Sequence, residues 1–138
     1  MGRQARSGGG SRPIAIGMVL FAGLMATLLR PEFAGAADAE SGKLVFQKCA
    51  ACHRLESGKH AIGPSLHGVL GRKAGTAEGF RRYSDTLRAA GFVWTRDRLD
   101  QWLAGPKKML PGTRMPFAGL PKPEDRADVI EYLAEAGK

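Results

Sequence analysis

Residues 49–53 read Cys-Ala-Ala-Cys-His and contain both cysteines of the chain. Two thiols three positions apart, followed directly by an imidazole, suit a metal site, a redox disulfide or covalent attachment of a haem. A structural zinc site would need two further soft ligands, and no second cysteine pair exists. A thioredoxin-like pair needs a βαβ context that is missing here, and a plain disulfide leaves His53 without a role. We therefore predict one covalent haem c, attached through Cys49 and Cys52.

The iron ligands follow from the same motif and from a second one downstream. His53 is the expected proximal ligand, and the Pro64 carbonyl is the candidate acceptor for its other ring nitrogen. On the opposite face, Pro111-Gly112-Thr113-Arg114-Met115 offers a thioether in an extended segment braced by prolines. Met115 is therefore the predicted second ligand. His/Met ligation raises the reduction potential and leaves no open position for a substrate, which favours an electron carrier over an enzyme.

Three other residues compete for the iron. His60 lies in a loop rich in Lys and Gly and is expected to be solvated. His67 is expected to be a hydrogen-bonded structural side chain. Met109 is by default a flexible core residue, and it would replace Met115 only if the loop between them moved.

The N-terminal 36 residues have the layout of a secretory signal peptide. Three arginines precede an apolar run at 14–29, and small residues follow it at 34–39. We expect residues 1–36 to be a signal peptide cleaved after Ala36, with Ala39 as the second choice of site. The alternative is an uncleaved N-terminal membrane anchor, although the run is somewhat short for a span. Either reading sends residues 37–138, the predicted haem-binding domain, to the periplasm.

The pattern of the remaining chain predicts an all-α, loop-rich single domain. Helical spacing predicts helices at 40–51, 84–90, 95–104 and from 123 onward. Asp38 or Ser41 is available to cap the first, and Thr95 to cap the third. The segment 54–75 is rich in Gly and Lys and is predicted to be a loop. The prolines in and around 107–122 exclude a continuous helix there.

Composition narrows the class of partner. The chain has 21 basic and 13 acidic residues and a formal net charge of +8. The basic residues are spread along the sequence and are not clustered with aromatic residues, which makes nucleic acid a poor fit. A positive surface suits an acidic protein face or an anionic membrane surface instead. Aromatic residues make up only 7% of the chain, so a large apolar cofactor would supply core area that side chains supply thinly.

Beyond these motifs, the chain resembles the class I cytochromes c, close to the mitochondrial type and its bacterial respiratory and photosynthetic relatives. The resemblance covers nearly all of residues 40–138, in order. It is carried by Cys49-Ala50-Ala51-Cys52-His53, Gly63-Pro64-Ser65-Leu66-His67-Gly68, Gly71-Arg72-Lys73, Trp94, Gly105-Pro106-Lys107-Lys108, Pro111-Gly112-Thr113-Arg114-Met115 and Tyr132-Leu133.

The resemblance implies a haem packed among three main helices, with the first and last crossing near Gly42, Phe46 and Tyr132. It further implies that the haem propionates accept hydrogen bonds from three residues, Arg72, Tyr83 and Trp94. Guanidinium and indole N–H groups are suitable donors for a buried carboxylate.

The function implied is that of a soluble, monomeric periplasmic carrier that shuttles single electrons between membrane redox complexes. A quinol–cytochrome c reductase would be the donor, and an oxidase, a reaction centre or a peroxidase the acceptor. Basic residues around an exposed haem edge would steer docking to acidic faces. The candidates are Lys48, Lys73, Lys107, Lys108 and Arg114. The rival functions are a haem peroxidase or gas sensor, which requires Met115 to dissociate, and a membrane-tethered electron-transfer module.

Three departures from the mitochondrial pattern affect the details. Two arginines, Arg81 and Arg82, separate Phe80 from Tyr83 where that pattern has one residue, so a bulge is expected to shift Tyr83. Met109 stands in place of a tyrosine, and Leu87 in place of an asparagine. The last two replacements predict a drier pocket on the Met115 side.

Overall fold

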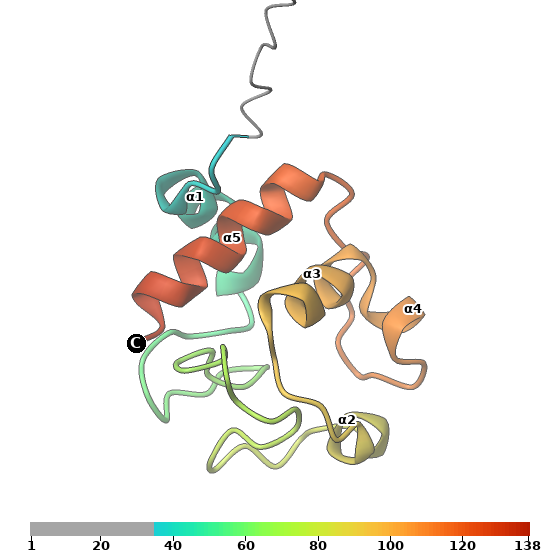
Figure 1. The fold of residues 1–138 in the computed structure, drawn as a ribbon. Coiled ribbons are helices and arrows are strands. Elements are labelled where there is room, and N and C mark those ends of the chain that lie inside the picture. The colour runs from blue at the N-terminus through green and yellow to red at the C-terminus, as the bar shows by residue number, and fades with distance from the viewer. Residues whose placement is uncertain (1–34) are drawn as a thin grey trace, which may run out of the picture. The chain divides into compact units, whose positions relative to one another are not determined.

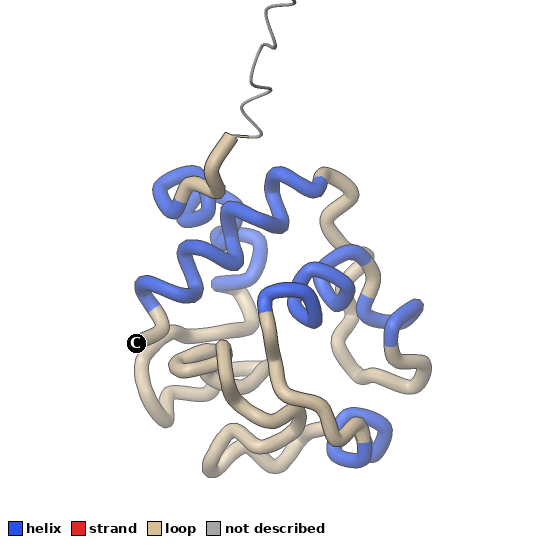
Figure 2. The backbone as a smooth tube through the Cα atoms, in the orientation of Figure 1, coloured by secondary structure: helices blue, strands red, loops and turns tan. Residues whose placement is uncertain are grey.

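The computed structural model describes residues 35–138, which form a small fold of helices joined by long loops (Figure 1). The helices are α1 (Ala39–Ala50), α2 (Asp85–Ala89), α3 (Arg96–Ala104), α4 (Pro106–Met109) and α5 (Pro123–Ala136). Within this part of the chain there is no strand, and a single isolated bridge pairs Lys73 with Val93 (Figure 2). The predicted all-α, loop-rich class is therefore confirmed.

The helix starts lie where the sequence indicates them. Asp38 caps α1 by accepting from two backbone N–H groups of the first turn. The hydroxyls of Ser84 and Thr95 cap α2 and α3, each accepting from one backbone N–H group. α5 begins at Pro123, whose missing N–H costs nothing in the first turn. All four starts agree with the predicted ranges to within one residue.

The segment rich in proline differs in one detail from the prediction. It is not a continuous helix, as expected, but its first residues form the short helix α4. Pro106 stands at the first position of α4, where its fixed φ favours a helical turn. After Leu110 the chain runs without regular structure to residue 122. This irregular segment carries Met115.

α1 and α5 pack against each other in the crossing that the resemblance implies (Figure 1). A Cβ added at Gly42 would run into the backbone carbonyl of Asp128, so only glycine permits the close approach. Next to this contact the rings of Phe46 and Tyr132 lie 5.4 Å apart between centroids. The backbone N–H of Asp38 also donates to the Asp128 carboxylate at 2.8 Å. The expected crossing near Gly42, Phe46 and Tyr132 is confirmed.

The irregular segment after Met115 is fastened to the helices at its far end. The N–H of Leu120 donates to the carbonyl of Leu103 at 2.7 Å, and the Leu120 side chain is almost fully buried. Arg126 of α5 donates to the Leu120 carbonyl at 2.9 Å and to the Asp100 carboxylate of α3 at 2.7 Å. α3, α5 and this segment are thus joined at one place.

The C-terminus lies against the loop that follows residue 64. The N–H of Gly68 donates to the carbonyl of Gly137 at 2.5 Å. A Cβ at Gly137 would press on the carbonyls of Leu133 and Leu66. The end of α5 and this loop therefore touch through their backbones.

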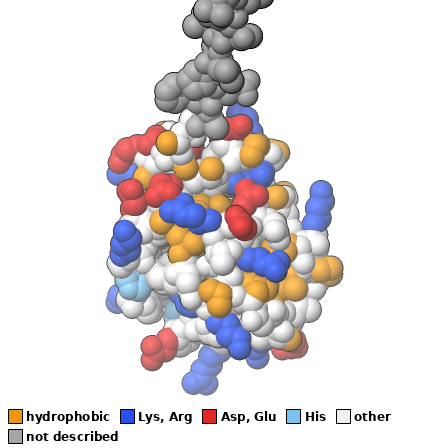
Figure 3. Space-filling model, viewed as in Figure 1, with side chains coloured by type: hydrophobic (Ala, Val, Ile, Leu, Met, Phe, Trp, Pro, Cys, Tyr) orange, Lys and Arg blue, Asp and Glu red, His pale blue; other side chains and the backbone are white. Residues whose placement is uncertain are grey.

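No helix among residues 35–138 is long and apolar enough to cross a membrane. The predicted leader, up to residue 34, lies outside the described residues. On the face shown in Figure 3, Lys and Arg side chains are scattered among apolar and acidic ones and do not gather in one patch.

Candidate functional site

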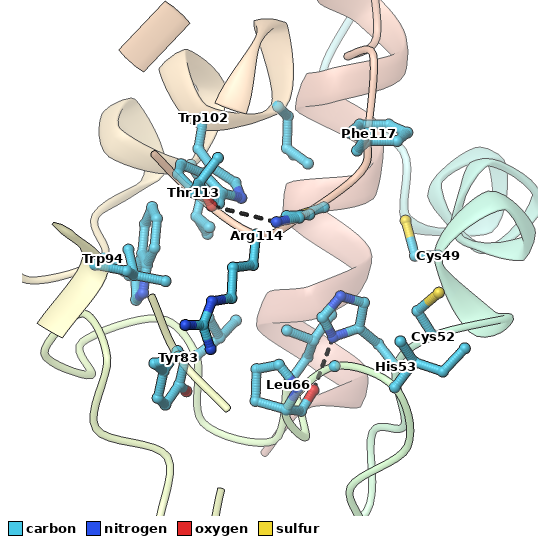
Figure 4. Close-up of a pocket in the computed structure, with 18 of the residues that line it drawn as sticks. Cys49, Cys52, His53, Leu66, Tyr83, Trp94, Trp102, Thr113, Arg114 and Phe117 are labelled. Atoms are coloured by element: carbon cyan, nitrogen blue, oxygen red, sulfur yellow. Dashed lines mark hydrogen bonds between the residues drawn. The ribbon is translucent and has the colours of Figure 1, made fainter. Parts of the chain in front are cut away.

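A pocket lies between the end of α1, the loops that follow it, α3, the segment around Met115 and α5 (Figure 4). Its walls are largely apolar and come from every part of the described chain. The apolar side chains that line it are Ile62, Leu66, Val69, Phe80, Leu87, Leu99, Leu103, Phe117, Val129 and Leu133. Such a pocket suits a large apolar ligand held by a few polar groups.

Both cysteines border this pocket, Cys49 from the last turn of α1 and Cys52 from just after its end. The helix ends at Ala50, and the N–H groups of Cys52 and His53 both donate to the Cys49 carbonyl, at 3.0 and 2.9 Å. This turn brings the two thiols and the imidazole to one side of the pocket (Figure 4). The thiols are free and half-buried, and burial raises the pKa of the Cys49 thiol. Two thiols beside one pocket suit addition to two vinyl groups of a ligand.

The His53 ring is oriented by the loop opposite it. His53 Nδ1 lies 2.7 Å from the Pro64 carbonyl, the acceptor expected from the sequence. A carbonyl only accepts, so Nδ1 carries the hydrogen and the Nε2 lone pair is free. Burial lowers the pKa of His53, against the opposing effect of the Pro64 hydrogen bond, and favours the neutral ring that binds a metal. A Cβ at Gly63 would run into the ring, so the loop can approach only with glycine there.

The two methionines of the distal segment differ in their relation to the pocket. Met115 is half-buried and lines it, with its N–H 3.4 Å from the Thr113 hydroxyl. Met109, on α4, packs against the hydrophobic core and is not among the lining residues of the described chain. Leu87 lines the pocket and is almost fully buried.

Arg72 and Trp94 line the same pocket and are joined through their backbones, and Figure 4 shows Trp94 across the pocket from the cysteines. The N–H of Trp94 donates to the Arg72 carbonyl at 2.9 Å. Two nitrogens of the Arg72 guanidinium donate to the carbonyls of His67 (2.8 Å) and Ser65 (3.0 Å). Burial lowers the pKa of Arg72. The group nevertheless stays charged, because the ordinary pKa of a guanidinium is very high. Its Nε–H and remaining hydrogens are available to an anionic group.

Tyr83 lines the same side in spite of the extra arginine before it. Its hydroxyl accepts from the N–H of Ala77 at 3.2 Å, which leaves the hydroxyl hydrogen to be donated. Burial raises the pKa of Tyr83, so the phenol remains a neutral donor. Arg72, Tyr83 and Trp94 are therefore brought together at one pocket.

The two rival histidines do not border the pocket in the described chain. The expectation that His60 is solvated was wrong: its Nε2 lies 2.7 Å from the Glu78 carbonyl, and its Nδ1 accepts from the N–H of Ser65 at 3.0 Å. The error arose because a carbonyl partner 18 residues away leaves no mark in the sequence. The backbone carbonyl of His67 accepts a hydrogen bond from the Arg72 guanidinium.

Several residues around the site were missed by sequence reasoning. The Ser65 side chain is buried, donating to the Glu56 carbonyl at 2.7 Å and accepting from the N–H of His67 at 3.1 Å. Arg82 and Arg88 also bond to loop carbonyls. The sequence offered one signal for these bonds, the serine in Gly63-Pro64-Ser65. A serine in a loop often bonds to nearby backbone groups.

The predicted docking residues divide into two groups. Lys48 and Arg114 line the pocket, and Lys48 also lies 3.8 Å from the Asp125 carboxylate. Lys107 and Lys108 are exposed on α4, and Lys73 is exposed beside Arg72. Positive charge therefore borders the pocket and also lies outside it.

The residues at the pocket fit a covalently attached haem. Two thiols and an imidazole with a free Nε2 lie on one side, a thioether lines the same space, and hydrogen-bond donors stand on the side away from the thiols. Apolar side chains line the pocket between these polar groups. This donor set, soft sulfur and neutral nitrogen, is the one that c-type haem uses.

Comparison with known proteins agrees with this site. The family model for Cytochrome c matches residues 39–137. Cytochrome c type-1 of Ascaris suum is 50% identical over 102 residues, which cover 73% of this chain and 90% of that protein. Cytochrome c2 of Rhodoblastus acidophilus is 46% identical over 101 residues, covering 72% and 94%.

A solved structure gives the same result at the level of the fold. Cytochrome cH from Methylobacterium extorquens superposes with a TM-score of 0.66 at 45% sequence identity, and the match covers 70% of this chain and 97% of that one. The chain therefore belongs to the cytochrome c family, as an electron carrier with one covalent haem c at Cys49 and Cys52.

Proposed function

We propose that this protein is a soluble periplasmic cytochrome whose haem iron is ligated by His53 and Met115 and which shuttles single electrons between membrane redox complexes. The observation that supports it best is that both side chains line one pocket, from segments more than 60 residues apart in the sequence. When bound, the haem supplies a one-electron iron couple. With His53 and Met115 both bound to it, the iron would have no open position for a substrate.

The chain's own residues tune that couple. The Pro64 carbonyl holds the Nδ1 hydrogen of His53, which fixes the tautomer and strengthens donation from Nε2. Arg72, Tyr83 and Trp94 present donors to the propionates at the other side of the pocket. The apolar walls exclude water, so little reorganisation accompanies the change in charge.

Docking is assigned to the positive groups that border the pocket, led by Lys48 and Arg114. They steer the protein to acidic faces on its donor, a quinol–cytochrome c reductase, and on its acceptor, an oxidase, a reaction centre or a peroxidase. Relatives named cytochrome c2 and cytochrome cH support a bacterial carrier of this kind. Residues 1–36 act as a signal peptide that takes the chain to the periplasm.

A methionine pair tests the ligation. In oxidised Met115→Leu we expect the far-red sulfur-to-iron absorption band to disappear, because the thioether is lost. Met109→Leu removes a thioether that is not among the pocket-lining groups of the described chain, and it should keep the band. Wild-type protein without the band has an open or differently ligated iron, and the peroxidase or gas-sensor reading would then replace the carrier.

Mass spectrometry of the exported protein tests the location. We expect an N-terminus at Ala37 and the added mass of one haem that acid–acetone does not extract. A mature protein that keeps Met1–Ala36 would instead be the membrane-anchored form.

A further inference from the structure

The segment between Phe80 and Tyr83 holds two adjacent arginines whose side chains have different surroundings. Arg82 lines the pocket, and its guanidinium donates to the carbonyl of Ala61, across the gap between two loops. The same guanidinium lies over the Phe80 ring, 5.4 Å from its centroid. Arg81 is exposed and takes part through its backbone carbonyl, which accepts from Arg88.

Arg88 of α2 holds the 80–83 segment, which contains the extra residue. Its Nη2 donates to the carbonyls on both sides of Arg82, those of Arg81 (2.9 Å) and Tyr83 (2.8 Å). This segment is therefore fixed to α2, and the Arg82 side chain, between the two bonded carbonyls, reaches the neighbouring loop. Tyr83 keeps its place against Phe80, with the rings edge to face at 4.9 Å.

The loop that Arg82 reaches is the one that orients His53. The N–H of Ala61 donates to the Gly63 carbonyl at 3.0 Å, and the N–H of Gly63 donates to the Cys52 carbonyl at 2.7 Å. The next carbonyl, that of Pro64, accepts the Nδ1 hydrogen of His53. The carbonyl that Arg82 binds thus lies only three positions before the carbonyl that holds the imidazole.

We propose that Arg82 is a positioning residue for His53: it ties the 61–64 loop to the 80–83 segment and so holds the Pro64 carbonyl against the imidazole. This inference rests on the proposed function in that His53 must be the iron ligand. His60, which joins Ser65 to the Glu78 carbonyl, links the same two loops at a second point. Arg82 differs from it in bonding within the short turn that contacts the His53 ring.

The test compares neighbouring arginines in the haem-loaded protein. Arg82→Ala and Arg81→Ala each remove one positive charge at adjacent exposed positions, so the net charge changes alike. The readout is the exchange rate of the His53 Nδ1 hydrogen, followed by NMR in the reduced protein. We expect this rate to rise about tenfold in Arg82→Ala, which is at the low end of what a hydrogen bond from a charged group contributes. Arg81→Ala should match wild type.

Two further measurements separate positioning from general loosening. Arg82→Lys keeps a donor within reach of Ala61 and should recover most of the protection. Backbone amides in α5 should exchange at the wild-type rate in all three variants. Equal Nδ1 exchange in Arg82→Ala and Arg81→Ala, or faster exchange throughout α5, would overturn the inference. A wild-type protein in which His53 shows no ligand signature fails at the proposed function instead.

Discussion

The two sides of the pocket are held together in different ways. On the helical side, α1, α3 and α5 pack through side chains, as in the contact of Phe46 with Tyr132, and are joined by ion pairs such as Arg126 with Asp100. On the loop side, between residues 54 and 84, polar side chains bond to backbone carbonyls. Loop carbonyls have no helix or sheet partners, so each needs another donor or water. The stability of the helical side thus depends mainly on the packing of side chains, and that of the loop side on individual hydrogen bonds.

The largest effect is expected where the two main helices touch. Gly42→Val places a branched side chain against the Asp128 carbonyl and forces α1 away from α5. We expect the free energy of unfolding to fall by about 3 kcal/mol, measured by urea denaturation of the haem-loaded protein. Leu44→Val, in the same helix but exposed, should change it by less than about 0.5 kcal/mol. Similar losses in the two variants would mean that the crossing does not depend on the close approach.

A smaller and more local effect is expected on the loop side. Ser65→Ala removes a buried hydroxyl and leaves the Glu56 carbonyl and the His67 N–H without their partner. The expected loss is about 1–2 kcal/mol. Because the Ser65 and His67 carbonyls hold Arg72, the reduction potential should also shift, as measured by equilibrium redox titration. Ser57→Ala, at an exposed position in the same loop, is the control and should leave both quantities unchanged.

The smallest effect concerns an exposed ion pair between α3 and α5. Arg96 donates to the Glu131 carboxylate at 2.6 Å and lowers the pKa of Glu131. A lowered pKa contributes stability above the ordinary carboxyl pKa, and this is lost as the pH falls through the value in the folded protein. Arg96→Ala should therefore be slightly less stable than wild type at neutral pH. The difference in thermal midpoint should vanish in acid, and a gap that persists there would rule out the ion pair as its cause.

The contrast between the two sides also explains what the sequence could predict. Helix caps such as Asp38 and Thr95, and glycines at close approaches such as Gly42, are marked by residue type and spacing, so the helical side was anticipated nearly in full. His53 and Pro64 could be paired because both belong to short motifs. The distal expectation of a drier pocket stays a prediction, with Leu87 on the pocket wall and Met109 away from it.

The partners of His60, Arg82 and Arg88 could not be anticipated for a physical reason. Each bonds to a backbone carbonyl, a group that every residue carries, so the identity of the acceptor residue holds no information. Their sequence separations, from five to 21 residues, follow the course of irregular loops and have no period. The short helix α4 was missed for a related reason, since a single turn after Gly105 has too few residues to show a pattern.

The contact between Gly137 and Gly68 has a practical consequence for anyone producing this protein. The last helix ends with its carbonyl bound to the loop whose neighbouring carbonyls hold Arg72. A purification tag fused directly after Lys138 would begin one residue from that bond. It would disturb the loop whose carbonyls hold Arg72. A flexible spacer of several glycines and serines before the tag avoids this, and untagged material is the proper reference for any redox measurement.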